Sequence, residues 1–261
     1  NFSFTSSFAP VGFAILVFIE VIQSTDVFAS NTIRITNGEW EPYLSEYSYE
    51  YGLASHIVSE AFKLEGIKVV WGFRPWVRAF DDAKKGEHWD ASAVWWPSED
   101  AKASFLISDP VINTSFVFFH LKKKNFHWQT FRDLKGLRIG TTRSYEYGND
   151  FKNAIKEGLF KNEDVTTDEQ NFQKLLKDRI DVFPNDPIVG AAQLRNSLLP
   201  EQAARITFNA KEFEKSTGHL IISKKCKNSS DFLKKFNSGL RKLKESGRLD
   251  QMFKDLATGK Y

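Results

Sequence analysis

The sequence has few of the residues on which redox, metal and covalent chemistry depend. Cys226 is the single cysteine among 261 residues, which excludes an internal disulfide framework and a metal site built from several cysteines. No nucleophile–histidine–acid constellation can be placed along the chain. The histidines show no metal-ligand spacing: His56, His88, His120, His127 and His219. We therefore expect no metal, no cofactor and a protein that is not an enzyme.

A strong excess of charge of one sign is also missing. The chain has 36 Lys and Arg against 33 Asp and Glu, which gives a formal net charge of +3. No basic stripe with interleaved aromatic residues appears, so we do not expect a nucleic acid as a partner. The basic run at 122–124 is explained most simply as a solvated strand end.

Long hydrophobic runs are absent as well. The apolar run at 11–19 is much shorter than the roughly 20 residues that a helix needs to span a bilayer. Small or apolar residues at Val27, Phe28 and Ala29 fit the positions that a signal peptidase recognises. We interpret residues 1–29 as a signal peptide and expect a periplasmic protein. The alternative is an N-terminal apolar helix that packs on the folded domain.

Aromatic residues, in contrast, are abundant. They make up 15% of the chain, with 24 Phe, 7 Trp and 7 Tyr. Most of these rings must lie in the core, but Trp residues near turns are typical of ligand clefts.

From residue 31 onward strand-like and helix-like segments alternate, which is typical of an α/β protein. Helical spacing of apolar residues marks 51–65, and Gly66 ends that helix. The other elements expected before Pro110 are strands at 32–36, 68–73 and 91–95, a helix at 76–85 and a short helix near Ser98. After Pro110 we expect strands at 115–121, 137–140, 180–183, 205–208 and 219–223, helices at 147–157, 168–177 and 186–196, and two C-terminal helices.

Four stretches, taken in order, resemble one protein family. They are WDASAVWWPSEDAKASFLISDPV at 89–111, GEWEPY at 38–43, DLKGLRIG at 133–140 and RIDVFPND at 179–186. Their order and spacing resemble those of the bacterial extracytoplasmic solute-binding protein family 3, the binding proteins of polar amino acid ABC transporters. The resemblance covers about residues 31–261.

The resemblance implies the two-lobed type II fold of periplasmic binding proteins. Each lobe is expected to be a mixed sheet flanked by helices, with a hinge near 111–115 and 212–217. Lobe 1 would comprise residues 31–113 plus 216–261, and lobe 2 residues 114–215. The resemblance also implies a membrane ABC permease as partner, and we expect a monomer.

Ligands of such folds lie beyond the carboxyl ends of the strands, where loops and helix starts from both lobes converge. In lobe 1 this predicts ligand contacts from Trp40 and Tyr43, with packing inside the lobe as the alternative. Trp76 and Arg78 open a helix after the second strand. Arg78 could bind a carboxylate or pair with a neighbouring aspartate on its own helix. Of the two Trp residues that end the third strand we favour Trp95, because strand alternation sends only one inward.

In lobe 2 the turn after the strand at 137–140 supplies Arg143, Ser144 and Tyr145. In the family this turn presents backbone N–H groups and a hydroxyl to the anionic end of the ligand. Its alternative role is to pack the start of the next helix. Asp186 falls where the family keeps the aspartate that binds the ligand ammonium. Asp186 could also cap the helix that follows it, and one residue can do both.

Asp100 falls where the family keeps the arginine that holds the ligand carboxylate. An aspartate in the first turn of a helix commonly stabilises the helix dipole. A carboxylate cannot receive a ligand carboxylate at neutral pH without a cation between them. We therefore expect Arg78 or Arg143 to supply that charge, or a ligand that is neutral or cationic.

Three functions are compatible with these observations. The preferred one is a periplasmic solute-binding protein that captures a small polar, zwitterionic or amino-acid-like ligand between its lobes for an ABC-type transporter. The second is a dehydratase-like enzyme on the same fold, with Glu146 or Asp100 as general acid. The third is a ligand-sensing module for a membrane partner.

Overall fold

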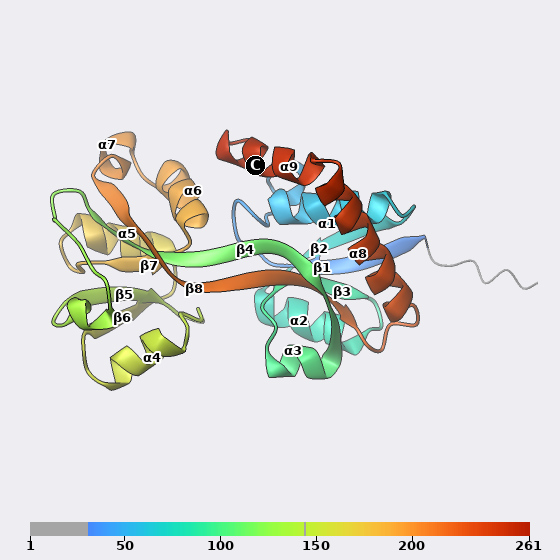
Figure 1. Ribbon diagram of the computed structural model, residues 1–261, viewed down its shortest axis with the longest axis horizontal. Coiled ribbons are helices and arrows are strands. Elements are labelled where there is room, and N and C mark those ends of the chain that lie inside the picture. The colour runs from blue at the N-terminus through green and yellow to red at the C-terminus, as the bar shows by residue number, and fades with distance from the viewer. Residues whose placement is uncertain (1–30, 144) are drawn as a thin grey trace, which may run out of the picture.

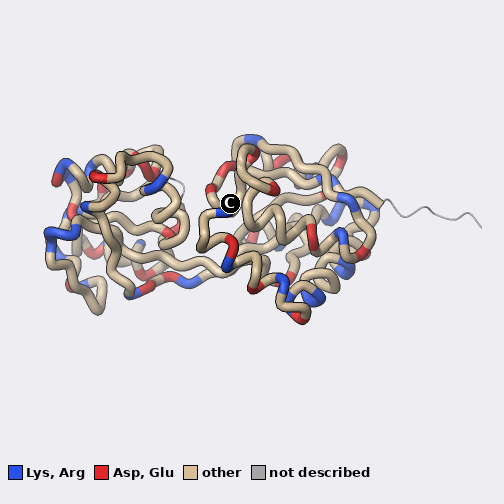
Figure 2. Tube along the Cα trace, turned by 90° about the horizontal axis from the view of Figure 1, so that it is seen from above, with Lys and Arg blue, Asp and Glu red and all other residues tan. Residues whose placement is uncertain are grey.

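The computed structural model describes residues 31–143 and 145–261 (Figure 1). The predicted signal peptide at 1–29 and the candidate site residue Ser144 lie outside the described residues. Across the described ranges, no helix combines the length and the apolar character needed to cross a membrane. Lys and Arg are interspersed with Asp and Glu over both lobes, as Figure 2 shows.

A six-stranded mixed sheet runs through both lobes in the order β2-β1-β3-β8-β4-β7. Strand β1 pairs in parallel with β2 and β3, whereas β8 is antiparallel to β3 and β4. A second sheet is the parallel pair β5-β6. The strands are β1 (Thr32–Asn37), β2 (Lys68–Phe73), β3 (Ala91–Trp95), β4 (Phe105–Leu121), β5 (Arg138–Thr142), β6 (Lys161–Val165), β7 (Phe183–Asn185) and β8 (Ile206–Ser223).

Lobe 1 carries helices on both faces of its part of the sheet (Figure 1). The helices are α1 (Leu53–Lys63), α8 (Ser229–Glu245) and α9 (Arg248–Ala257) on one face and α2 (Trp76–Lys85) and α3 (Glu99–Ser104) on the other, with the short 3-10 helix η1 (Tyr49–Tyr51) before α1. A Cβ atom on Gly239 would lie 1.9 Å from the carbonyl oxygen of Ala61. Helix α8 therefore crosses α1 at direct backbone contact.

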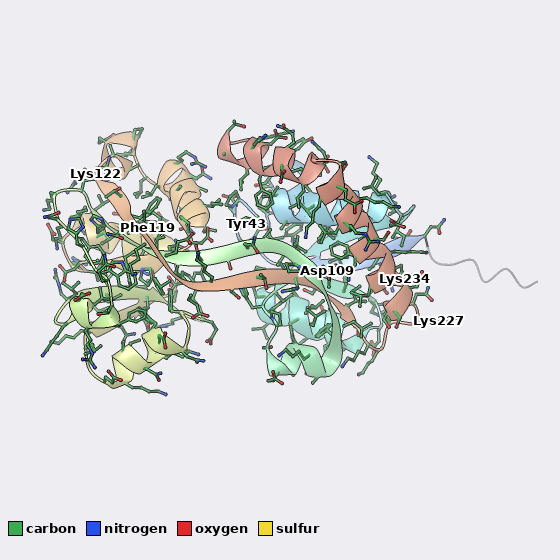
Figure 3. All side chains as sticks on the ribbon, viewed as in Figure 1. Tyr43, Asp109, Phe119, Lys122, Lys227 and Lys234 are labelled. Carbon is green, nitrogen blue, oxygen red and sulfur yellow. The ribbon has the colours of Figure 1, made fainter. Side chains whose placement is uncertain are left out.

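Lobe 2 has two apolar clusters, which share β4. Alternate residues of a strand point to opposite faces, so Phe118 joins a cluster with Phe151 and Phe213, while Phe119 packs with Phe172. Figure 3 labels Phe119 in this lobe. The helices are α4 (Asn149–Lys156), α5 (Asp168–Leu176), α6 (Pro187–Ser197) and α7 (Pro200–Ala203), with the 3-10 helix η2 (Phe131–Leu134).

A two-stranded ribbon of β4 and β8 connects the lobes (Figure 1). Its pairing runs from Phe105 opposite Ser223 to Leu121 opposite Ile206. The register shifts at four places, two of them between Thr114 and Phe118. Such irregularities bend a strand and increase its twist.

The predicted α/β architecture with two lobes and mixed sheets flanked by helices is confirmed. The predicted bounds at 68–73, 76–85 and 91–95 match β2, α2 and β3. Three predictions about strands were wrong. The expected strands at 205–208 and 219–223 are one strand, β8; the strand expected at 115–121 begins at Phe105; and the one expected at 180–183 is displaced to β7. Strand β6 and helix α7 were not predicted.

Candidate ligand site between the lobes

Trp76, at the start of α2, packs on the loop that follows β1. Trp76 lies over Gly38, where an added Cβ would approach the Trp76 ring to 2.4 Å. The Trp76 indole N–H donates a hydrogen bond of 3.3 Å to the carbonyl oxygen of Glu39. Glycine is therefore required at position 38 so that the β1 loop and the start of α2 can approach closely.

Trp95 and Trp96 have different surroundings. The Trp95 ring packs edge-on against Trp76 at 5.2 Å and Phe80 at 5.0 Å, and its indole N–H donates to Ser92 Oγ at 2.7 Å. Trp96 is 41% exposed, and its ring lies 5.4 Å from that of Trp40. The sequence analysis favoured Trp95, yet Trp96 is the ring that the structure brings to Trp40.

Trp96 also reaches the ribbon between the lobes. Its indole N–H donates to Thr114 Oγ1 on β4 at 3.3 Å, and the Thr114 hydroxyl donates to the carbonyl oxygen of Ser216 on β8 at 3.4 Å. Trp96 therefore connects the aromatic group of lobe 1 to both strands that cross between the lobes.

Tyr43 is the third ring of this group and is fully buried. Its ring centroid lies 4.8 Å from that of Trp40, at an interplanar angle of 37°. Its hydroxyl is buried and has no hydrogen-bond partner. Burial, followed by the negative charge of Asp186, raises the pKa of Tyr43 far above its ordinary value. The phenol is therefore protonated at neutral pH and free to bond a ligand.

Asp186 lies on the lobe 2 side of this contact and is 5% exposed. It caps α6, because its Oδ1 accepts hydrogen bonds from the backbone N–H groups of Ile188 at 2.9 Å and Val189 at 3.1 Å. The backbone of Ser115 on β4 donates to it as well. Burial raises its pKa, and the nearby charge of Glu212 acts in the same direction. No ion pair joins Asp186 to a cation of residues 31–143 or 145–261.

Helix α6 rests on the loop after β1, so the lobes touch here. Val189 is fully buried within the main apolar cluster of lobe 1, which also contains Tyr43. Asn196 near the end of α6 donates a hydrogen bond of 3.3 Å to the Glu41 carboxylate. Figure 3 labels Tyr43 between the two lobes. Tyr43 thus lies beside both Trp40 and Asp186.

Tyr145 belongs to a second buried acidic group in lobe 2, centred on Asp168. Asp168 is 5% exposed and accepts hydrogen bonds from the hydroxyls of Thr142 at 2.5 Å and Tyr145 at 3.0 Å. The side-chain amides of Gln193 and Asn185 donate at 2.9 and 3.4 Å. Burial, and then Asp168, raise the pKa of Tyr145 well above its usual range. Sequence reasoning missed Asp168, because its partners come from separate segments.

The two candidate arginines are exposed. Arg78 lies in the first turn of α2, but Asp82 pairs with Arg74 at 2.6 Å and with Lys85 at 3.2 Å instead. Neither Arg78 nor Arg143 forms an ion pair within the described ranges. Arg143 lines a hollow of 260 Å³ beside α4 and β6. The structure therefore does not join either arginine to the Trp40–Asp186 contact.

The two acids considered for catalysis carry ion pairs with neighbouring lysines. Asp100 lies in the first turn of α3 and its carboxylate accepts from Lys84 on α2 at 3.0 Å. Glu146 is exposed and pairs with Lys152. Within the described part of the chain, no group of three or more His, Cys, Asp or Glu residues could hold a metal ion.

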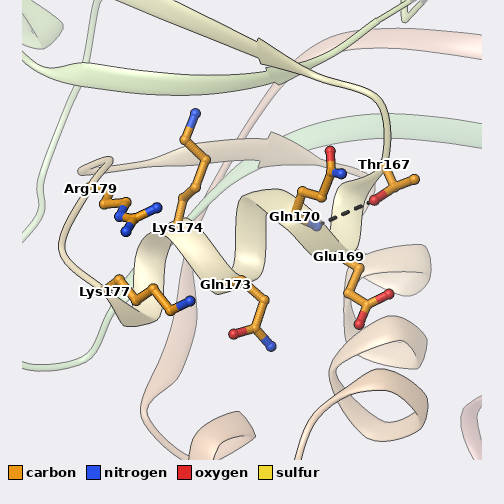
Figure 4. A pocket seen from close by; sticks show the side chains of 7 residues that line it. All are labelled: Thr167, Glu169, Gln170, Gln173, Lys174, Lys177 and Arg179. Atoms are coloured by element: carbon orange, nitrogen blue, oxygen red, sulfur yellow. Dashed lines mark hydrogen bonds between the residues drawn. The ribbon is translucent and has the colours of Figure 1, made fainter.

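A larger hollow of 420 Å³ lies along α5, away from the lobe contact (Figure 4). Its lining side chains are mostly exposed and of both charges: Thr167, Glu169, Gln170, Gln173, Lys174, Lys177 and Arg179. The dashed line in Figure 4 is the helix cap, in which Thr167 Oγ1 accepts from the Gln170 backbone at 3.4 Å. Nothing in this hollow is a buried polar group without a partner.

A comparison with models of protein families finds no match to this chain. A comparison with curated proteins also finds none. Solved structures do match. A mutant of ArgBP from T. maritima superposes with a TM-score of 0.65 at 17% identity, over 87% of this chain and 96% of that one.

Two further structures match over similar lengths. A histidine kinase sensor domain with similarity to periplasmic binding proteins has a TM-score of 0.67 at 15% identity, covering 86% of this chain and 95% of that one. An ancestral amino-acid-binding protein, a precursor of cyclohexadienyl dehydratase, has a TM-score of 0.64 at 18% identity, covering 87% and 95%. These similarities confirm that the chain has the two-lobed fold of periplasmic binding proteins.

Proposed function

We propose that this chain is a periplasmic solute-binding protein that holds a small, amine-bearing ligand between its lobes and delivers it to a membrane ABC permease. One observation carries the proposal: Asp186 is a buried carboxylate that faces Tyr43 across the lobe contact without a cationic partner among the described residues. The amino-acid-binding proteins among the structural neighbours support it.

The energetics of Asp186 favour a cationic ligand. A buried charge is costly unless it is paired, and a carboxyl group without a counter-charge raises its pKa, as Asp186 does. A ligand ammonium would supply the missing charge and add charge-assisted hydrogen bonds. The unpartnered hydroxyl of Tyr43 is available to the same ammonium as an acceptor.

The ribbon of β4 and β8 supplies the hinge in this proposal. The lobe boundaries would lie between residues 113 and 114 on β4 and between residues 215 and 216 on β8, close to the register shift between Thr114 and Phe116. Opening at that point would separate α6 from the loop after β1 and expose Tyr43 and Asp186. A ligand closes the lobes only to the extent that it binds the closed state more tightly than the open one.

The enzymatic and sensory alternatives have less support. Glu146 and Asp100, the candidate general acids, pair with Lys152 and Lys84 on the surface. One neighbour is a dehydratase precursor and another is a sensor domain, but no contact among residues 31–143 and 145–261 favours either role over solute binding.

The variant Asp186→Asn tests the proposal, because Asn caps a helix about as well as Asp while the negative charge is removed. We expect the affinity for amines and amino acids to fall by about tenfold or more, from the loss of a charge-assisted hydrogen bond. Isothermal calorimetry on the purified chain against a panel of such compounds measures this. Urea unfolding of the same variant should show stability within about 0.5 kcal/mol of the original chain.

Unchanged affinity in Asp186→Asn would remove Asp186 from the site. A panel in which no compound gives heat with the original chain would contradict the solute-binding role itself. Binding should also weaken as the pH falls through the raised pKa of Asp186, because a protonated carboxyl group no longer attracts an ammonium.

A further inference from the structure

We infer that the ligand of this site is a small organic cation without the carboxylate of an amino acid, and that its apolar body lies against Trp40 and Trp96. This inference rests on the proposed function and narrows it from amine-bearing ligands in general to amines that lack an anionic end. Three independent features of the lobe contact support it: the charge of the loop after β1, the aromatic wall and the arrangement of polar groups.

The loop after β1, which reaches the contact from lobe 1, carries negative charge. Residues 38–48 contain Glu39, Glu41 and Glu46 but no Lys or Arg. After β3, in contrast, Glu99 and Asp100 pair with Lys102 at 2.8 Å and Lys84 at 3.0 Å, so that turn adds no unpaired charge. On the lobe 2 side the acid close to Tyr43 is Asp186. Glu212 lies near Asp186 and pairs with Lys215 at 2.8 Å. A ligand carboxylate would enter this environment against repulsion, whereas a cation is attracted.

The rings of Trp40, Tyr43 and Trp96 form a wall suited to a cation with an apolar body. Trp40 is flanked by Tyr43 at 4.8 Å and by Trp96 at 5.4 Å, with interplanar angles of 37° and 66°. The three rings therefore do not stack on one another in parallel. The face of an indole attracts an ammonium or guanidinium group, and the ring also buries methylene groups. Trp96 is exposed enough to meet an incoming molecule, at 41%.

The polar groups at the contact match one cationic end. Asp186 offers a buried carboxylate. The Tyr43 hydroxyl near it is also buried and has no hydrogen-bond partner. An ammonium group carries three donors and no acceptor, so these two oxygens can receive it together. Asp186 forms no ion pair with a Lys or Arg of residues 31–143 or 145–261, so a ligand carboxylate beside it would meet an uncompensated negative charge.

Arg78 and Arg143 provide the competing possibility. Both are exposed and have no ion pair within the described ranges. If either swings to the contact when ligand binds, it would hold a carboxylate, and an amino acid would then be preferred. The test must therefore compare ligands that differ only in that group.

Four matched pairs of compounds serve as probes: agmatine and arginine, cadaverine and lysine, tyramine and tyrosine, phenethylamine and phenylalanine. Within each pair the amine differs from the amino acid only by the carboxylate. Calorimetry is performed on the chain after unfolding, dialysis and refolding, which removes any ligand carried from the cells. We expect at least one amine to bind about tenfold or more tighter than its parent amino acid, as one charge contact of about 1.4 kcal/mol implies.

The outcomes separate the inference from the proposed function. A preference for the amino acids in every pair that binds overturns the inference and leaves the solute-binding role intact. In that case, a tenfold loss of arginine binding in Arg78→Gln or Arg143→Gln would identify the group that holds the carboxylate. No binding by any of the eight probes, amines and amino acids alike, contradicts both.

The aromatic wall is tested with Trp96→Leu and Trp96→Phe. Loss of the ring should weaken binding of the preferred amine about threefold to tenfold, and Phe should restore most of it, because the interaction depends on the ring. Trp89→Leu is the matched control, since Trp89 packs over Gly72 and under Arg74, outside the contact. Equal affinity in Trp96→Leu and the original chain would remove Trp96 from the site.

Discussion

The lobes differ in what they bring to their contact: lobe 1 presents aromatic rings, and lobe 2 presents buried carboxylates. Trp40, Tyr43 and Trp96 are held by ring packing, and Trp96 also by the hydrogen bond from its indole N–H to Thr114. Asp168 and Asp186 are held by hydrogen bonds from several surrounding groups each. Rings select by shape and apolar area, whereas a buried carboxylate selects by charge.

The difference also concerns how each acid is satisfied. The Asp168 carboxylate accepts hydrogen bonds from four neutral side-chain donors, so its hydrogen bonding is satisfied without a ligand. Asp186 receives backbone N–H groups only, and its charge remains uncompensated by any cation of the described residues. This difference supports a structural role for Asp168 and the ligand contact that we propose for Asp186.

The largest effect on stability is expected from Asp168→Ala. The substitution leaves the hydroxyls of Thr142 and Tyr145 and the amides of Gln193 and Asn185 without their shared acceptor. Several unsatisfied buried donors should lower the free energy of unfolding by about 3 kcal/mol or more. Urea denaturation followed by tryptophan fluorescence measures the change.

Glu169→Ala is the matched control for this variant. Glu169 is the next residue of α5 and is exposed, so its loss should change stability by no more than about 0.5 kcal/mol. Equal stabilities of the Asp168 and Glu169 variants would show that the Asp168 group is not the structural centre of lobe 2.

Regular segments of the fold were predictable from the sequence, because their apolar spacing and end signals are local. Helix α2 ends at Gly86, which adopts the left-handed conformation that glycine favours. The polar segments were not predictable in this way. The β6 segment KNEDV has no apolar alternation and is a strand because its backbone pairs with β5. The middle of β8 is likewise polar and exposed, and it pairs with β4.

The candidate site was predictable in part for the same reason. Trp40, Tyr43 and Asp186 follow the ends of strands, and the topology of the fold brings strand ends together. Trp96 was passed over because alternation along β3 was assumed to be regular, but the pairing of β3 with β8 shifts register between Ser92 and Trp95. The Asp168 group has no sequence signal, since its members lie on four separate segments.

A smaller effect should appear in the pH dependence of stability, through His56 in lobe 1 and His120 in lobe 2. Burial lowers the pKa of His56 on α1 and of His120 on β4. Both are therefore held neutral in the folded state, while the unfolded chain binds their protons near pH 6.5. The contribution of these two histidines to stability is fully present above that pH. It declines as the pH falls through 6.5 toward the lower pKa values of the folded state.

The variants His56→Gln and His120→Gln should each flatten this decline, by at most about 1.4 kcal/mol per pH unit. Denaturation curves at several pH values between 5 and 8 measure it. His88→Gln is the control, because His88 is exposed and its loss should leave the slope unchanged. A slope that is the same in all three variants would place the acid sensitivity elsewhere in the chain.

The smallest effect is expected from Asp100→Ala, although this is where the sequence resemblance places a ligand-binding arginine. The Asp100 side chain is 65% exposed and its partner Lys84 is 41% exposed. An exposed ion pair contributes about 1 kcal/mol or less, so stability should change little and amine binding not at all. A severalfold gain or loss of affinity in calorimetry would instead place Asp100 at the ligand.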